Sequence, residues 1–130
     1  MGTVIAFAVL ASLLTLHLGG PRPVLGPLDA PRVLATVGYG GPAYSESLRF
    51  SIRARGGTIR PQRGTHCDRQ LVGWTCLALP LHEGATEPLS FLVTGLRAGT
   101  PLVVTARVSS PHAFAEAVLR RPVRRYGDAP

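Results

Sequence analysis

The sequence has no lysine, two cysteines, one methionine and one tryptophan in 130 residues. Cys67 and Cys76 stand nine positions apart, so the close CxxC pairs typical of structural zinc sites are missing. Neither a GxSxG nor an HExxH element is present. The glycine cluster Gly38–Gly41 is followed by no predicted helix and no Lys-Ser/Thr, which disfavours a phosphate-binding loop. No catalytic set can therefore be recognised, and no cofactor or metal is expected.

Acidic residues are also scarce: seven stand against fourteen basic ones, for a formal charge of +7. Arginine suits bidentate contacts with phosphate and carboxylate groups. A basic set made of arginine alone, beside abundant Ala, Gly, Pro and Val, is more typical of a GC-rich coding bias than of selection for a ligand. The charge predicts loose attraction to acidic polymers or anionic surfaces.

The chain is rich in apolar residues (45%), with 15 glycines and 12 prolines. Its length gives room for one domain, which can bury a core without help from a metal. This composition indicates many short strands and turns rather than disorder.

Residues 4–18 form an uncharged apolar run. Its length suits the core of a signal peptide better than a membrane-spanning helix, which needs about 20 apolar residues. No Arg or Lys precedes the run, and the small-residue exit after Gly20 would leave proline at the new terminus. A cleaved leader, an uncleaved signal anchor and a mis-assigned start therefore stay open. The run is followed by a proline-rich linker, residues 21–31.

Period-2 alternation predicts the strands. The cleanest case is 47–55, with Leu48, Phe50, Ile52 and Ala54 on one face and three arginines on the other; this pattern is typical of a half-buried antiparallel strand. Arg32–Val37 and Thr58–Arg60 are further candidates. Two runs, 89–94 and 102–108, joined by a loop with glycines, predict a β-hairpin. Residues 113–119 fit either a last strand or a helical turn.

Two cysteines in an exported chain most simply pair, and a short hairpin would bring Cys67 and Cys76 within disulfide distance. Closing a loop of about ten residues stabilises by roughly 2–3 kcal/mol in the chain-entropy model. Two alternatives stay open. One is a metal site of both cysteines with His66 or His82, and the other is a Cys-His nucleophile.

A hydrolase is a further alternative. The histidines are scattered, and the test is whether His66 and His82 converge with an acidic residue such as Asp68 or Glu83 in the folded chain. The histidines are His17, His66, His82 and His112.

Residues 47–108 resemble the conserved-repeat, immunoglobulin-like β-sandwich domain of bacterial surface and secreted proteins, a family of unknown function. The matching residues are Gly56-Gly57, Cys67, Trp74-Thr75-Cys76-Leu77, Gly84-Ala85-Thr86, Leu89–Val93 and Gly99-Thr100 through Thr105-Ala106-Arg107-Val108. The asparagine-rich segment that usually follows the closing strand is absent. The resemblance implies an extracellular or envelope structural module with no catalytic residues to carry over. A fibronectin-like sandwich fits the strand spacing nearly as well.

The sequence thus predicts an all-β chain: a small antiparallel immunoglobulin-like β-sandwich preceded by a hydrophobic leader helix. The predicted divisions are a signal peptide or anchor (1–20), a linker (21–31), the sandwich (32–119) and a basic tail (120–130).

The predicted function is a non-catalytic structural or adhesion module, secreted or in the cell envelope, stapled by Cys67 and Cys76. Expected partners are envelope polymers or surface proteins, with a membrane contacted only through residues 4–18 if the leader is uncleaved. The alternative is a binder of nucleic acid or another anionic polymer. Nucleic acid is disfavoured because Phe50, Trp74 and Phe91 fall on apolar faces rather than among the basic residues. Candidate anionic contacts are Arg49, Arg53, Arg55, Arg120, Arg121, Arg124 and Arg125.

Overall fold

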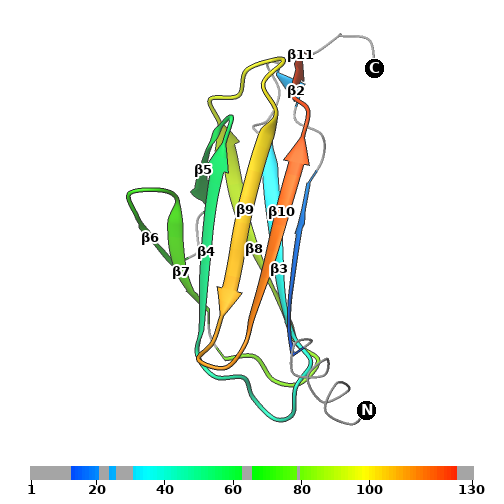
Figure 1. Ribbon diagram of the computed structural model, residues 1–130, viewed down its shortest axis with the longest axis vertical. Helices are drawn as coiled ribbons and strands as arrows, with labels where there is room; N and C mark the ends of the chain where they lie inside the picture. The colour runs from blue at the N-terminus through cyan, green and yellow to red at the C-terminus, as the bar shows by residue number, and fades with distance from the viewer. Residues whose placement is uncertain (1–12, 21–23, 26–30, 63–65, 79, 126–130) are drawn as a thin grey trace.

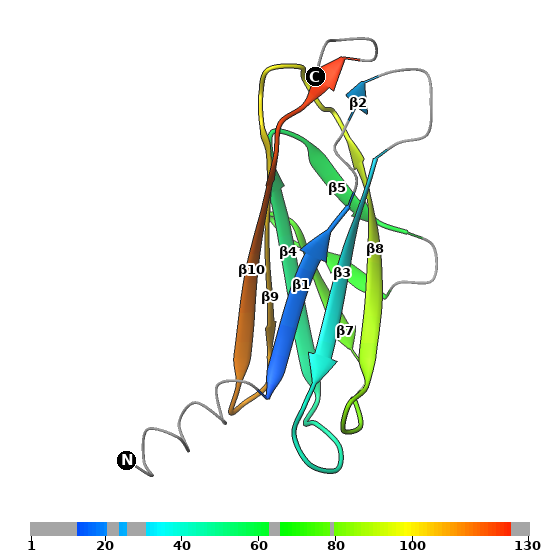
Figure 2. The ribbon, with the colours of Figure 1, turned by 90° about the vertical axis from the view of Figure 1, so that its right-hand side faces the viewer.

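Two antiparallel β-sheets pack face to face in the computed structural model, which describes residues 13–20, 24–25, 31–62, 66–78 and 80–125 (Figures 1 and 2). The four-stranded sheet has the spatial order β1 (Leu14–Gly19), β3 (Arg32–Tyr39), β8 (Thr86–Thr94) and β5 (Thr58–Pro61). The five-stranded sheet has the order β10 (Phe114–Arg121), β9 (Leu102–Ser109), β4 (Leu48–Arg55), β7 (Trp74–Ala78) and β6 (Cys67–Arg69). A short parallel pair joins β2 (Val24–Leu25) to β11 (Arg124–Arg125).

This strand order is that of an immunoglobulin-like sandwich. The order β1-β3-β8-β5 matches the A-B-E-D sheet of that fold, and β10-β9-β4 matches G-F-C, with β7 and β6 added beyond the C position. The described residues contain no helix. The prediction of a small antiparallel immunoglobulin-like β-sandwich is confirmed. The leader helix is not shown, because residues 1–12 lie outside the described part.

The core lies between the inward faces of the two sheets. Phe50 on β4 and Phe91 on β8 are both fully buried, with ring centroids 5.8 Å apart. Burying a side chain of this kind stabilises by roughly 1.5–3 kcal/mol. The other buried apolar side chains are Leu14, Leu18, Val33, Ala35, Val37, Leu48, Ile52, Ile59, Cys76, Leu81, Leu89, Val93, Leu102, Val104, Ala106, Val108, Leu119 and Val123.

The period-2 predictions for individual strands are confirmed. On β4 the even positions Leu48, Phe50 and Ile52 are buried and the odd positions 49–55 are exposed. On β8 and β9 every second residue is buried as expected. The candidate strands at 32–37 and 58–60 are β3 and β5, and β3 extends two residues further, through Gly38 and Tyr39.

The predicted hairpin between 89–94 and 102–108 is wrong. β8 pairs with β3 and β5, whereas β9 pairs with β4 and β10, so the loop 95–101 crosses from one sheet to the other. Both strands turn apolar faces to the core, but from opposite sides. The alternation is the same for strands that pair within a sheet and for strands that face one another across the core, so it could not separate the two cases.

The end of the predicted leader belongs to the sandwich. Residues 14–19 form β1, which pairs with β3 from Leu14 opposite Tyr39 to Gly19 opposite Leu34. Leu14 and Leu18 are buried. These residues form a strand because apolar and polar side chains alternate in Leu14-Thr15-Leu16-His17-Leu18, at the end of the apolar run. The sandwich therefore begins at Leu14, inside the stretch 1–20 that the sequence assigned to the leader, and the position where a leader ends stays a prediction. Within the described residues there is no helix with the length and hydrophobicity needed to cross a membrane.

The chain ends of the sandwich also differ from the predicted divisions. The undecided stretch 113–119 is strand β10, which continues through Arg121 and pairs with β9. Four residues assigned to the basic tail thus lie in strands β10 and β11, and β2 lies inside the predicted linker. Val24-Leu25 is a proline-free dipeptide, so its backbone can pair with β11.

Candidate interaction surface

The solvent-facing side of the five-stranded sheet, called here the outer face, carries a row of arginines along β4. Arg49, Arg53 and Arg55 are exposed there, because the alternating residues of β4 are used in the core. Alternate residues on a strand lie about 6.7 Å apart. Arg120 joins this surface, since both it and Arg55 are in register with Val103 of β9. Within the described residues none of these four side chains has a carboxylate partner.

The other predicted arginines lie elsewhere. Arg121 is in register with the buried Leu102, so it points to the inner side of β10. Arg124 and Arg125 form β11, paired with β2 at one end of the sandwich (Figure 1). The structure therefore brings four of the seven candidate arginines to one face and separates the other three.

Sequence reasoning did not single out Arg107, which lies on the outer face of β9. Its guanidinium is 3.4 Å from a Glu116 carboxylate oxygen and 4.4 Å from the ring centroid of Phe114. The alternation of β9 places Arg107 outward, so the sequence did contain the information that this arginine lies on the outer face. What the sequence could not give was the β9–β10 register that sets Glu116 opposite it.

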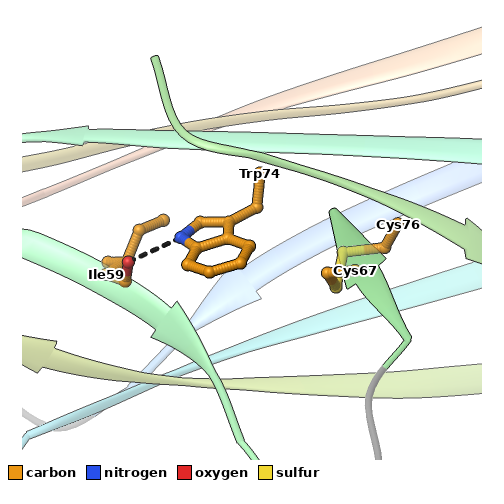
Figure 3. The surroundings of a disulfide bond; sticks show 4 residues. All are labelled: Ile59, Cys67, Trp74 and Cys76. Carbon is orange, nitrogen blue, oxygen red and sulfur yellow. Dashed lines mark hydrogen bonds between the residues drawn. A yellow bond between two sulfur atoms is a disulfide. The ribbon is translucent and has the colours of Figure 1, made fainter. Parts of the chain in front are cut away.

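The two cysteines form a disulfide, as predicted. Cys67 on β6 and Cys76 on β7 are directly opposite in the register of the two strands (Figure 3). Cys76 is buried, and Cys67 packs against the core. No cysteine is free. The bond removes both thiols from the metal-site and nucleophile alternatives.

Trp74 lies on the inward side of β7, beside the disulfide. Its indole Nε1 donates a hydrogen bond of 2.8 Å to the carbonyl oxygen of Ile59 on β5 (Figure 3). Val72, two positions before Trp74, precedes the strand and is 67% exposed.

The turn of the β6–β7 hairpin, residues 70–73, is called here the hairpin tip. Leu71 and Val72 are both exposed, and Figure 1 shows the hairpin standing out from the side of the sandwich. Two shallow hollows of about 360 and 270 Å³ lie on the outer face beside Val72, and both are bordered by Arg53. A third, of about 470 Å³, lies between the tip and β5, bordered by Arg60 and Arg69.

The histidines do not form a catalytic group in the described residues. His17 is exposed on β1, and His82 pairs with Tyr44 as an isolated bridge. His112 Nδ1 is 2.7 Å from Glu46 Oε1, and both side chains are largely exposed. No three His, Cys, Asp or Glu side chains of the described part are arranged to hold a metal.

Comparison with known proteins finds a shared fold. No family model matches the chain, and no curated protein sequence matches it. Solved structures that match include a human F-spondin reeler domain (fragment 2) and the Reelin-N domain of F-spondin. The human reeler domain is 11% identical, with a TM-score of 0.51 over 87% of this chain and 93% of that one. The Reelin-N domain is 13% identical, with a TM-score of 0.51 over 85% of this chain and 87% of that one. At these identities the likeness shows the sandwich fold alone.

Proposed function

We propose that this chain is a non-catalytic module of the cell exterior or cell envelope, with a structural or adhesive role. The observation that carries the proposal is the Cys67–Cys76 disulfide, because such bonds form and persist in oxidising compartments. The uncharged apolar run of residues 4–18 adds the sequence signal of an exported chain.

The distribution of side chains supports the same role. Every long strand buries one face in the core, which leaves the outer face, the loops and the hairpin tip for contacts. The resemblance of residues 47–108 to the conserved-repeat surface domains points the same way, although membership of that family stays a prediction.

The test is export and oxidation in a secreting host. The protein is expressed with its leader, and its intact mass is measured before and after reduction and thiol alkylation. We expect export of the chain, with two alkylated cysteines appearing only after reduction. Retention in the cytoplasm with two free thiols would contradict the proposal.

The row of arginines on β4 favours a second function, binding of an anionic polymer along the outer face. Exposed arginines in one line, without carboxylate partners in the described residues, suit a linear polyanion. Binding of polyphosphate or single-stranded DNA should weaken steeply with salt, and Arg53→Ala with Arg55→Ala should reduce it. Unchanged binding by that double variant would remove this function.

A further inference from the structure

The hairpin tip presents two aliphatic side chains to solvent. Leu71 is fully exposed and Val72 is 67% exposed, although each carries apolar surface that water disfavours. They are adjacent in sequence, at the turn where β6 ends and β7 begins. Single exposed aliphatic side chains are ordinary in soluble proteins. Two adjacent ones on a projecting turn form a small exposed apolar patch, which is the kind of surface that contacts a protein or a membrane.

The base of the hairpin is fixed to the sandwich. The disulfide joins β6 to β7, β7 pairs with β4, and the Trp74 indole is bonded to Ile59 of the opposite sheet (Figure 3). These three links fix the base of the hairpin, which limits the conformational entropy that the tip loses when it binds.

Arginines flank the tip on two sides. On the outer face Arg53 and Arg55 border the hollow next to Val72. On the other side Arg60 of β5 and Arg69 of β6 border the hollow that Leu71 and Val72 share with β5. All four are exposed, and within the described residues none has a salt bridge.

Acidic groups near the tip do not cancel this charge. Glu116 borders the outer hollow but is 3.4 Å from Arg107. Asp68 lies on the outer side of β6, opposite Thr75. Among the residues that the structure describes, four arginines therefore flank the tip against one carboxylate without a salt bridge, that of Asp68.

We propose that the hairpin tip and its four flanking arginines dock this domain onto the surface of an anionic phospholipid bilayer. Leu71 and Val72 enter the boundary between headgroups and acyl chains, and the arginines contact lipid phosphates. This inference rests on the proposed function at the cell exterior or envelope, and it names the contact surface.

The shape of the site favours a bilayer over other anionic partners. The aliphatic side chains stand on a projecting turn rather than in a groove, so a protein partner would have to provide a pocket for them. The arginines lie on both sides of the turn, whereas one linear polymer follows a single face. A plane of phosphates surrounding an inserted tip meets all of them at once.

The first experiment measures binding of the oxidised full chain to vesicles of phosphatidylcholine alone and of phosphatidylcholine with phosphatidylserine. The fluorescence of Trp74, the single tryptophan, reports the contact. We expect binding to the anionic vesicles only. Leu71→Ser with Val72→Ser should weaken it by at least about tenfold. The matched control is Leu77→Ser, an exposed leucine on β7 away from the tip, which should bind as the parent does.

The second experiment tests the arginines. Arg53→Gln, Arg55→Gln, Arg60→Gln and Arg69→Gln should each weaken binding roughly fivefold. Arg32→Gln, an exposed arginine on β3 of the four-stranded sheet that borders none of these hollows, is the control and should leave vesicle binding unchanged. Each variant is first checked for the disulfide and for the parental unfolding midpoint.

Two results would overturn the proposal: no binding to anionic vesicles, or equal binding by the Leu71/Val72 variant. If the chain does not bind vesicles but binds soluble poly-glutamate, the site is assigned to an acidic protein instead. These failures are distinct from failure of the proposed function. Export and disulfide formation are read from the secreted protein, whereas lipid binding is measured on purified oxidised chain.

Discussion

The indole nitrogen of Trp74 donates a hydrogen bond to the carbonyl oxygen of Ile59, 2.8 Å away, and so joins β7 of the five-stranded sheet to β5 of the four-stranded sheet. Elsewhere the two sheets meet mainly through apolar packing. The bond ties the projecting β6–β7 hairpin to the body of the sandwich.

Replacing Trp74 with phenylalanine should lower the free energy of unfolding by about 1–3 kcal/mol, since the Ile59 carbonyl loses its donor. Urea unfolding followed by circular dichroism measures the change. The control Leu77→Ala, on an exposed side chain of the same strand, should stay within about 0.5 kcal/mol of the parent. Equal losses of unfolding free energy for the two substitutions would mean that the Trp74–Ile59 hydrogen bond makes no measurable contribution to stability.

The double variant Cys67→Ser with Cys76→Ser should lose roughly 2–3 kcal/mol, because the unfolded chain is no longer constrained by the closed loop. Reducing the parent protein should cause the same loss, measured by denaturant unfolding with and without reductant. The variant itself should not respond to reductant. A parent protein that is equally stable when reduced would contradict this prediction.

Gly73 and Gly84 both have φ of +78°, yet alanine should affect them very differently. At Gly84 an added Cβ meets open space, so only the backbone cost of roughly 1–2 kcal/mol applies. At Gly73 the Cβ would collide with the carbonyl oxygen of Ile52 on β4, so the hairpin must shift. Unfolding midpoints of Gly73→Ala and Gly84→Ala test this, and a smaller loss at Gly73 would contradict the collision.

If the leader is removed on export, the cut should fall before Leu14. A chain starting after Gly20 lacks β1 and the buried side chains of Leu14 and Leu18, whereas one starting at Leu13 keeps them. Truncation of a buried leucine to alanine typically costs 2–5 kcal/mol, so Leu18→Ala should be clearly destabilising and the exposed His17→Ala should not. The intact mass of the secreted protein locates the cut. A stable product starting at Pro21 would contradict the placement of β1.

Side-chain direction was predictable from the sequence, and strand partners were not. The alternation of Leu48, Phe50 and Ile52 identified the inner face of β4 because a strand has a period of two whatever its neighbours are. The same alternation on β8 and β9 led to the incorrect prediction of a hairpin. The alternation shows which residues face the core, but it does not show whether the loop between β8 and β9 stays in one sheet or crosses to the other.

The candidate surface also shows that side-chain direction could be predicted from the sequence and strand pairing could not. Arg49, Arg53 and Arg55 were assigned to one face from their spacing, and they lie there. Arg120 joined them only through the register of β10 with β9. The flanking of the tip by Arg60 and Arg69 depends on two strands of different sheets, so no local pattern could reveal it. The alternation Leu14-Thr15-Leu16-His17 did signal β1, but it was hidden within a longer apolar run.

On one side of the sandwich the edge strands of the two sheets are both short: β5 has four residues and β6 has three. Exposed strand edges are templates on which a second chain can add, which leads to aggregation. Here β5 ends at Pro61, which has no backbone N–H to donate, and β6 carries the charged Asp68 and Arg69. On the opposite side, β1 and β10 lie beside one another, so each partly covers the edge of the other sheet (Figures 1 and 2). The domain should therefore stay monodisperse at concentrations where a sandwich with long bare edges would form fibrils.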